Sequence, residues 1–532
     1  MDAAVAMAAG LNVMEPTSTG IGGDAFALFY RASDRTVHAM NGSGRSPAAL
    51  TLDAVRKELG AEATELPALH AHSITVPGAA AAWADSVDRW GSGALSLSQI
   101  LAPAVRLARE GAPIGPITAR MWGDAEATLR GTGASGLLVP GEDGAPGRAP
   151  RAGEVWRNES LAATMEAVGA GGKAAFYSSS SLIARAVVEA VRSRGGVMTA
   201  EDLEAHETDW PEPISTAYGR SRVWECPPNG QGLAALVALN IVEAASGGDA
   251  ASLGPAERAH VMLCAMRLAF ADARRYIADP AAMDVTTEAL LSKGYAAERA
   301  ALIPAFGSGE DAAGVVAGEA RHGAPTSGSD TVSFQTVDAA GNAVAYINSN
   351  YMGFGSHVEP AGTGFTLQNR GANFSLEAGH PNALGPGKRP YHTIIPCMGT
   401  LLADEPAEAA AGADGGVPAG SLLFSASVMG GFMQPQGHLQ VVVNLVDLGM
   451  EPQAALDAPR FCIASGEVGG AASLEPGFEG AAELEARGHI LDGERRGWGR
   501  SLFGRGQVIW RDPAGTLWGG SDPRGDGCAS GW

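Results

Sequence analysis

Two hydroxyl side chains are brought together by a predicted β-hairpin. The segments Thr331–Val337 and Ala343–Ser349 are rich in residues that favour strands, and they flank Ala339–Asn342, a sequence typical of hairpin turns. If residue 338 pairs with residue 343, Ser349 lies within one position of the residue opposite Thr331. We therefore expect the Thr331 and Ser349 hydroxyls to converge at one end of the hairpin.

Thr331 could act as a nucleophile if a base lay beside it. A threonine hydroxyl is a weak nucleophile on its own, but cleavage of the chain before Thr331 would create an adjacent α-amine with a pKa of about 8. The preceding residues 304–330 are rich in Gly, Ala and Ser and predict a flexible, exposed linker. The alternative is an ordinary threonine at the start of a strand.

Gly430 and Gly431 lie between the predicted buried strand Leu422–Val428 and an amphipathic helix that follows Pro435. Two successive amides without side chains, near the N-terminus of a helix, can hold the negative oxygen of an acyl-transfer intermediate. The alternative is a glycine turn that serves packing.

Other motifs are less specific. Arg45 could bind a substrate carboxylate or form a surface salt bridge, and His392 could line a pocket or be an ordinary satisfied histidine. Gly20–Ala25 fits G-x-G-x-x-A, but a strand follows it where a dinucleotide site requires a helix, so we interpret it as a tight turn or a substrate-facing loop. The eleven histidines show no HxxxH or HExxH spacing and the five cysteines no CxxC pair, so no metal site or cofactor is predicted.

The composition is that of a globular protein with a sizeable core, since 45% of the 532 residues are apolar and 18% are charged. The net charge of −21 argues against a nucleic-acid scaffold or a protein bound to an anionic membrane. No apolar stretch is long enough to span a membrane. The first ten residues lack the basic region of an export signal and predict a helix, which favours a cytoplasmic location.

Strands and long helices alternate along the chain. A strand is predicted at Phe26–Tyr30. Helices are predicted at Ala79–Trp90, Leu95–Arg109, Leu161–Val168, Leu182–Arg194 and Ala256–Ile277. Two strand-rich halves with long helices predict layers of helices packed on sheets.

Together, these residues resemble the gamma-glutamyltransferase family. The similarity follows the family's order along the whole chain and is carried by Pro16–Gly23, Val76–Gly78, Phe270–Asp272 with Asp279–Pro280, Asp338–Val344, Phe354–Gly355, Gly362–Gly364, Pro386–Pro390, Ala458–Phe461 and Ser521–Arg524. Family members usually have additional residues before this point. The resemblance implies an α+β fold, the four-layer αββα sandwich of N-terminal-nucleophile hydrolases, formed as one intertwined domain by two subunits of a proenzyme.

The resemblance also implies the cleavage site. Counting back from the turn at Asp338, the family's nucleophilic threonine falls on Thr331 without a gap. Self-cleavage between Asp330 and Thr331 would then produce a large subunit, 1–330, and a small subunit, 331–532.

The remaining catalytic positions follow in the same way. The residue that supports the nucleophile falls on Ser349, and the glycines of the oxyanion hole fall on Gly430 and Gly431. These are the positions at which the residues alone already predict this chemistry. The family requires no cofactor and no metal.

The substrate-binding positions depart from the family pattern. The carboxylate-binding arginine of the family aligns with Ser43, two positions before Arg45. The aspartate that binds the substrate α-amino group becomes Asn373, whose neutral amide would hold a glutamyl ammonium less tightly. The family's asparagine and paired serines are replaced by Tyr351, His392 and Thr393. This pattern is similar to a divergent branch that includes oxamate amidohydrolase and gamma-glutamyltransferase-like acylases.

We therefore predict an autoprocessing amidohydrolase that cleaves a small, non-glutamyl amide such as oxamate through an acyl-enzyme. The residues predicted to contact substrate are Arg45, Tyr351, Asn373, His392 and Thr393. The alternatives are a true gamma-glutamyltransferase or glutathione hydrolase, and an unprocessed, non-catalytic family member. The expected partners are a small-molecule amide and the two subunits of one precursor, with no nucleic acid and no membrane; assembly into a further homodimer is left open.

Overall fold

The computed structural model describes residues 1–141, 145–306, 329–403, 417–463 and 470–532. Most of the predicted linker 304–330 therefore lies outside the described residues. Within the described part of the chain, no helix has the length and hydropathy needed to cross a membrane.

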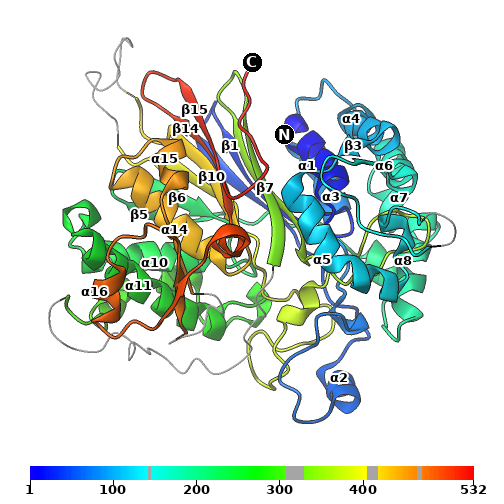
Figure 1. Ribbon diagram of the computed structural model, residues 1–532, viewed down its shortest axis with the longest axis horizontal. Coiled ribbons are helices and arrows are strands. Elements are labelled where there is room, and N and C mark those ends of the chain that lie inside the picture. Colours follow the sequence, from blue (N-terminus) through cyan, green and yellow to red (C-terminus); the bar gives the residue numbers. More distant parts are fainter. Residues whose placement is uncertain (142–144, 307–328, 404–416, 464–469) are drawn as a thin grey trace.

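Two antiparallel sheets occupy the centre of the fold (Figure 1). The first has the strand order β2-β1-β8-β7 and consists of β1 (Asp24–Arg31), β2 (Thr36–Gly42), β7 (Ser329–Val337) and β8 (Ala343–Met352). The second has the order β15-β14-β10-β9-β6-β5 and consists of β5 (Ile214–Tyr218), β6 (Ser221–Glu225), β9 (Cys397–Leu401), β10 (Leu422–Met429), β14 (Arg505–Arg511) and β15 (Leu517–Ser521). Each sheet thus contains strands from both sides of residue 330.

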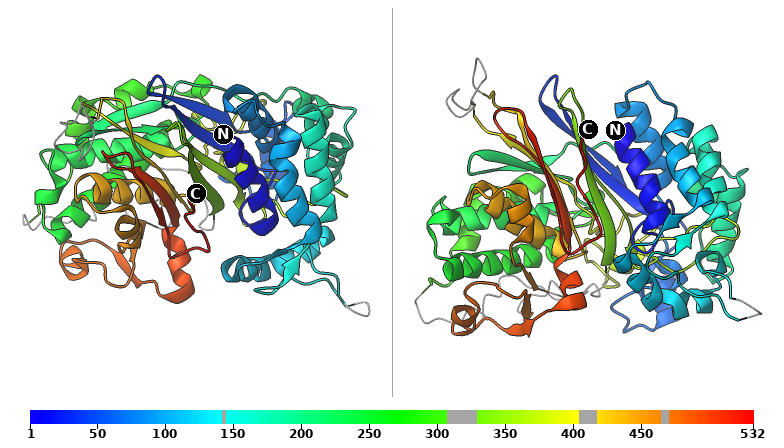
Figure 2. Two further views of the ribbon diagram at one scale, coloured as in Figure 1. Left: turned by 90° about the horizontal axis from the view of Figure 1, so that it is seen from above. Right: turned by 45° about the horizontal axis from the view of Figure 1, so that its top comes forward.

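Helices cover the outer face of each sheet, and the sheets face one another across a shared apolar layer. Helices α1 (Asp2–Met14) and α3 (Ala79–Trp90) contact the strands of the first sheet, and α4 (Leu97–Glu110), α6 (Glu159–Gly171) and α8 (Leu182–Arg192) belong to the same apolar cluster. Helices α10 (Gly232–Ala245), α14 (Met433–Val446) and α15 (Pro452–Asp457) contact the strands of the second sheet, and α11 (Pro255–Tyr276) packs against α10 and α14. The two helical groups lie on opposite sides of the sheets in Figure 1 and again when seen from above in Figure 2.

Smaller elements complete the described fold. The remaining helices are α2 (Leu52–Leu59), α5 (Pro116–Thr132), α7 (Ala174–Tyr177), α9 (Ala200–Glu204), α12 (Thr287–Leu290), α13 (Lys293–Ala300) and α16 (Ala481–Glu485). The remaining strands are β3 (Ala112–Pro113), β4 (Val155–Trp156), β11 (Phe461–Ile463), β12 (Ala472–Leu474) and β13 (Leu491–Glu494).

The predicted helices and strands outside the linker are present. The bounds of α3 are those predicted, and the helix predicted at 256–277 is α11. Helix α5 is not evident from the sequence, because Gly123 and Gly131 lie inside it and few of its side chains are buried. Its apolar pattern is therefore too weak to stand out.

Both faces of the first sheet are buried, which decides where its side chains point. Along β1, Phe26 and Leu28 belong to the apolar layer between the sheets, whereas Ala27 and Phe29 pack toward the helices. Since side chains alternate along a strand, Asp24 lies on the face directed at the second sheet. The same alternation places Ser349 of β8 and Thr331 of β7 on that face.

The hairpin of β7 and β8 is present, but its register differs from the prediction by one residue. Val337, rather than residue 338, pairs with Ala343, and this register continues to the pair Val332 and Asn348. Before Thr331 the register shifts, because Asp330 pairs with Tyr351. A β-bulge thus lies at Thr331, with one extra residue on the β8 side.

Candidate active site

The Thr331 and Ser349 hydroxyls lie 3.0 Å apart, measured from Oγ1 to Oγ. Both side chains are buried. Ser349 Oγ also accepts a hydrogen bond from the backbone N–H of Tyr351, at 2.9 Å. The predicted convergence of the two hydroxyls is therefore confirmed.

Arg370 connects Ser349 to other predicted site residues. It begins the short 3₁₀ helix η7 (Arg370–Asn373) and donates from Nη2 to Ser349 Oγ (3.2 Å) and from Nη1 to Thr393 Oγ1 (2.6 Å). Its guanidinium carbon lies 4.4 Å from the centre of the Tyr351 ring. Burial lowers the pKa of Arg370 to about 10, so it stays charged at neutral pH. The two hydrogen bonds that Ser349 accepts favour donation of its own proton to Thr331 Oγ1.

Gly430 and Gly431 lie between β10 and α14, as predicted, and both have positive φ angles, of 131° and 60°. Gln231, the N-cap residue of α10, donates from Nε2 to the carbonyl oxygens of Gly431 (2.8 Å) and Thr393 (2.7 Å). Because Thr393 also binds Arg370, a continuous set of contacts joins the glycine pair to the two hydroxyls. No described residue accepts a hydrogen bond from either glycine amide, so both amides are available to an oxyanion.

Asp24 begins β1 opposite Ser349 and forms a buried pair with His392. Its Oδ2 lies 3.1 Å from His392 Nε2, and its Oδ1 accepts from the amides of Gly44 and Gly78, both at 3.1 Å. His392 Nδ1 accepts from a backbone N–H, so Nε2 carries the proton and donates to Asp24. Burial raises the pKa of Asp24 to about 7 and lowers that of His392 well below its usual range. The pair is thus a carboxyl group bound by a neutral imidazole.

The raised pKa of Asp24 predicts a pH-dependent stability. Between about pH 4 and the folded-state pKa of about 7, the folded chain holds a proton that the unfolded chain has released. The contribution of Asp24 is therefore fully present below about pH 4 and is lost as the pH rises through about 7. From about pH 4.5 to about pH 8, the chain should lose roughly 2–4 kcal/mol of unfolding free energy relative to Asp24→Asn. Urea unfolding in a Thr331→Ala background would measure this difference, and a pH-independent difference would contradict it.

The glycine-rich segment Gly20–Ala25 forms a turn before β1 and packs directly on β8. A Cβ atom added at Gly23 would lie 2.3 Å from the carbonyl oxygen of Ser349 and 2.7 Å from Asn350 Oδ1. The glycine therefore permits a close backbone approach to Ser349, the partner of Thr331. This segment serves the packing of the site.

Gly23→Ala should consequently displace β8 at Ser349. We expect a loss of about 1–3 kcal/mol in unfolding free energy, because a backbone oxygen cannot move as a side chain can. Gly10→Ala is a matched control, since a Cβ atom at Gly10 of α1 meets nothing within 4 Å. Urea midpoints of the two variants compare them directly, and equal stability would show that β8 accommodates the methyl group.

Two predicted substrate residues stand apart from this network. Arg45 donates from Nη1 to Asp279 Oδ2 (3.0 Å) and to the carbonyl oxygen of Gly387 (3.2 Å), in a partly exposed ion pair. Asn373 is buried at the end of η7, and neither polar atom of its side chain has a hydrogen-bond partner among the described residues. The structure therefore joins Tyr351, His392 and Thr393 to the hydroxyl pair more directly than Arg45.

Sequence reasoning did not single out Asp24, Gln231 and Arg370. Asp24 follows the glycine turn directly, and Arg370 lies among the polar residues 368–371, so both stood within motifs that were noticed. A charged residue in a buried segment is a candidate for a functional role, because charged side chains are rarely buried without a partner. That burial becomes visible only once the chain is folded.

Three groups of described residues carry ligand-type atoms close enough to hold a metal ion: His260 with Cys264 and His489, Glu58 with His70 and His72, and Glu225 with Cys397 and His438.

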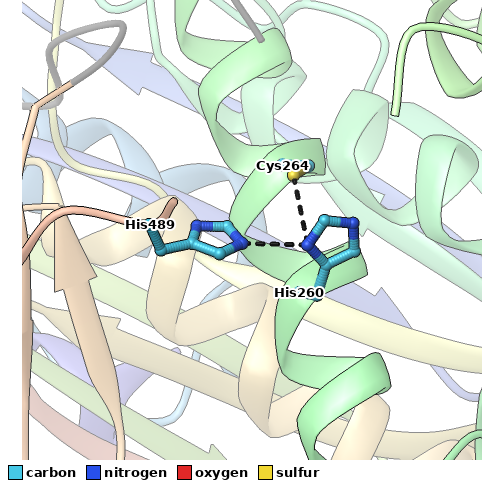
Figure 3. A group of neighbouring side chains, drawn as sticks. All are labelled: His260, Cys264 and His489. Atoms are coloured by element: carbon cyan, nitrogen blue, oxygen red, sulfur yellow. Dashed lines mark hydrogen bonds between the residues drawn. The ribbon is translucent and has the colours of Figure 1, made fainter. Parts of the chain in front are cut away.

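The first group is shown in Figure 3. Arg267 Nη1 donates to His489 Nδ1 (3.0 Å), so His489 Nε2 carries the proton and donates to His260 Nδ1 (2.9 Å). His260 Nε2 then donates to the carbonyl oxygen of Pro304 (2.9 Å). Burial lowers the pKa of both histidines and raises that of the Cys264 thiol to about 12. In this arrangement every ring nitrogen of the two histidines already takes part in a hydrogen bond, and both imidazoles are neutral.

The other two groups also hold hydrogen bonds of their own. His70 Nδ1 accepts from the backbone N–H of His72, so its Nε2 is protonated and donates to Glu58. Glu225 Oε1 lies 2.7 Å from His438 Nδ1, and His438 Nε2 has no described partner. A metal-bound histidine usually donates its other N–H to an acceptor. Neither group therefore has the donor pattern that favours a metal ion.

Comparison with known proteins places these observations in context. A family model described as gamma-glutamyltranspeptidase matches residues 1–532. The chain is 34% identical to the glutathione hydrolase-like YwrD proenzyme of Bacillus subtilis (strain 168), covering 100% of this chain and 93% of that protein. It is 30% identical to the oxamate amidohydrolase proenzyme of Klebsiella pneumoniae, covering 100% of this chain and 94% of that protein. A crystal structure of cephalosporin acylase from Bacillus halodurans is 41% identical, with a TM-score of 0.85, and covers 100% of this chain and 91% of that chain.

Proposed function

The chain belongs to the gamma-glutamyltranspeptidase family of amide-bond hydrolases, and we propose that it is an autoprocessing amidohydrolase whose nucleophile is the N-terminal threonine of its small subunit. The observation that carries the proposal is the 3.0 Å contact between Thr331 Oγ1 and Ser349 Oγ, at the β-bulge of strand β8 opposite Thr331. The proposal includes subunits 1–330 and 331–532 and the αββα sandwich of N-terminal-nucleophile hydrolases. The two facing sheets with helices on their outer faces support that architecture.

Self-cleavage would begin with attack of Thr331 Oγ1 on the carbonyl carbon of residue 330. The peptide C–N bond breaks, an ester forms, and the nitrogen becomes the α-amine of Thr331; water then hydrolyses the ester and leaves a carboxylate on residue 330. The bulge supports this step, because regular strand pairing is interrupted at that residue. Both sheets contain strands from each side of the cut, so the two subunits would stay together.

Catalysis would reuse the same groups. The α-amine of Thr331 takes the hydroxyl proton, directly or through water, while Oγ1 attacks the substrate carbonyl. The amides of Gly430 and Gly431 stabilise the oxyanion, and Ser349 orients and polarises the nucleophile. The amine leaving group departs with a proton, and water then releases the acyl group.

The substrate is proposed to be a small, non-glutamyl amide, such as oxamate. Asn373 offers no negative charge to an α-ammonium group, which weakens binding of a glutamyl substrate. Tyr351, His392 and Thr393 are proposed to line the acyl site beside Ser349, with Arg45 a further candidate for substrate contact. The oxamate amidohydrolase among the relatives supports this class of substrate.

The test is a panel of amides assayed with the purified protein, with ammonia and glutamate measured separately. N-terminal sequencing of the two fragments should identify Thr331 as a new terminus. Ammonia from small amides, without glutamate from glutathione at ordinary concentrations, is the expected result. Two chains with a different new terminus would contradict the proposed nucleophile.

Two other functions are distinguished by the same samples. The first is a gamma-glutamyl hydrolase or transferase, which would release glutamate from glutathione. The glutathione hydrolase-like relative at 34% identity favours this alternative. The second, a non-catalytic family member, would run as a single band near 54.1 kDa and release neither product.

A further inference from the structure

Arg370 is a buried cation whose direct contacts are neutral. Its guanidinium contacts the hydroxyls of Ser349 and Thr393 and the ring of Tyr351, and burial raises the pKa of that tyrosine to about 12. Asp24 stabilises the charge electrostatically, but its oxygens are bound by other groups, and no described carboxylate contacts the guanidinium. A buried charge without a paired counter-charge is costly unless an anion joins it.

Unused donors lie beside this charge. The two hydroxyls take two of the five N–H donors of Arg370, and Nε has no partner among the described residues although it is buried. Asn373 lies three residues later in η7, hence on the same face of the 3₁₀ turn, and its amide is also unpartnered within the described structure. A guanidinium edge and an amide on the same face of the turn offer donors that match the acceptors of a carboxylate.

We propose that Arg370, assisted by Asn373, binds a carboxylate carried by the acyl group, so that the substrates are short dicarboxylic acid monoamides. This inference rests on the proposed function of Thr331. The contacts of 3.0 Å and 3.2 Å through Ser349 Oγ limit the separation of Thr331 Oγ1 and Arg370 Nη2 to 6.2 Å. An attack distance of about 3 Å and a hydrogen bond of about 2.8 Å already span most of that length. A short acyl group of two to about four carbons can therefore reach both groups, whereas a longer one would have to fold back on itself.

Processing would open this subsite. In the intact chain, the backbones of Ser329 and Asp330 pair with Met352 and Tyr351, beside the ring that carries the guanidinium. Cleavage before Thr331 would separate Ser329 and Asp330 from the rest of β7. The carboxylate subsite is therefore a property of the processed enzyme.

The experiment compares matched anionic and neutral amides on the processed enzyme: oxamate against oxamide, and succinamate against succinamide, with glutaramate and adipamate as longer anions. We expect kcat/KM to favour each short anion by at least about 100-fold and to fall for the longer ones. In Arg370→Gln the anionic preference should drop to about one, and Arg370→Lys should retain part of it. Arg120→Gln should keep the preference, because that guanidinium lies on the exposed surface of α5, paired with Asp124.

Each outcome decides between separate claims. Equal rates for anionic and neutral amides, an unchanged preference in Arg370→Gln, or a preference lost equally in Arg120→Gln would overturn this inference while leaving the proposed amidohydrolase in place. If Arg370→Gln fails to fold or to be processed, inhibition of the wild-type enzyme provides the test. Malonate should inhibit the hydrolysis of a neutral amide far more strongly than malonamide does. Equal inhibition by the two compounds would overturn the inference. A chain that stays intact and hydrolyses no amide would overturn the proposed function itself.

Discussion

Replacing Thr331 by alanine is expected to leave the protein as one polypeptide of 532 residues without amidohydrolase activity. The substitution removes the hydroxyl 3.0 Å from Ser349 Oγ, which is proposed both to cut the chain and to attack the substrate. The intact chain also keeps nitrogen 331 in a peptide bond, so the proposed base is never formed. Hydrolysis should fall by at least about 10⁴-fold, as when other hydrolases lose their nucleophile.

A denaturing gel and an ammonia assay measure both effects on one preparation. Thr331→Ser keeps a hydroxyl and should still be cut, more slowly or at similar speed, and remain active. Thr336→Ala, on the same strand, is the matched control and should behave as the wild type. Cleavage or turnover by the alanine variant at Thr331 would show that another residue performs the chemistry.

Gly430→Ala is expected to lower kcat by about 10²- to 10³-fold, the usual cost of one misplaced oxyanion donor. Gly430 has a φ of 131°, in a region that residues with a Cβ atom rarely adopt. The added Cβ atom would also lie 3.1 Å from Gly504 Cα and 3.2 Å from Met433 Cβ. The backbone must therefore rotate, which turns the amides of the glycine pair away from the carbonyl oxygen they are proposed to hold.

The effect should appear mainly in kcat, because the amides act on the charge that develops during the reaction. Self-cleavage should slow as well, since it passes through the same kind of intermediate. Gly123→Ala in α5, where a Cβ atom meets nothing within 4 Å, is the control for adding a methyl group. Unchanged kcat in a folded, processed Gly430→Ala enzyme would argue that these amides hold no oxyanion.

Much of the candidate site was predictable because its residues lie close together in the sequence, within one hairpin and one strand-to-helix connection. The turn at Ala339–Asn342 determines which residues face Thr331, so the convergence with Ser349 followed from hairpin geometry alone. The register error of one residue did not change this outcome, because the observed register, continued by one pair from Val332 and Asn348, places Ser349 opposite Thr331. The glycine pair was predictable for a similar reason, since a strand, two glycines and a helix follow one another directly in the sequence.

The sequence by itself determined the β7–β8 hairpin, the place of the glycine pair and several of the long helices, all of which depend on residues near one another in the chain. Only the tertiary structure decided that Arg370 contacts Ser349 and Thr393, that Gln231 links Thr393 to Gly431, and that Asp24 meets His392. These contacts join segments that are separate in the chain, and neither periodicity nor spacing encodes them. The environment of each arginine also depends on the tertiary structure. The sequence does not show whether an arginine forms a surface ion pair, as Arg45 does with Asp279, or is buried among neutral partners, as Arg370 is.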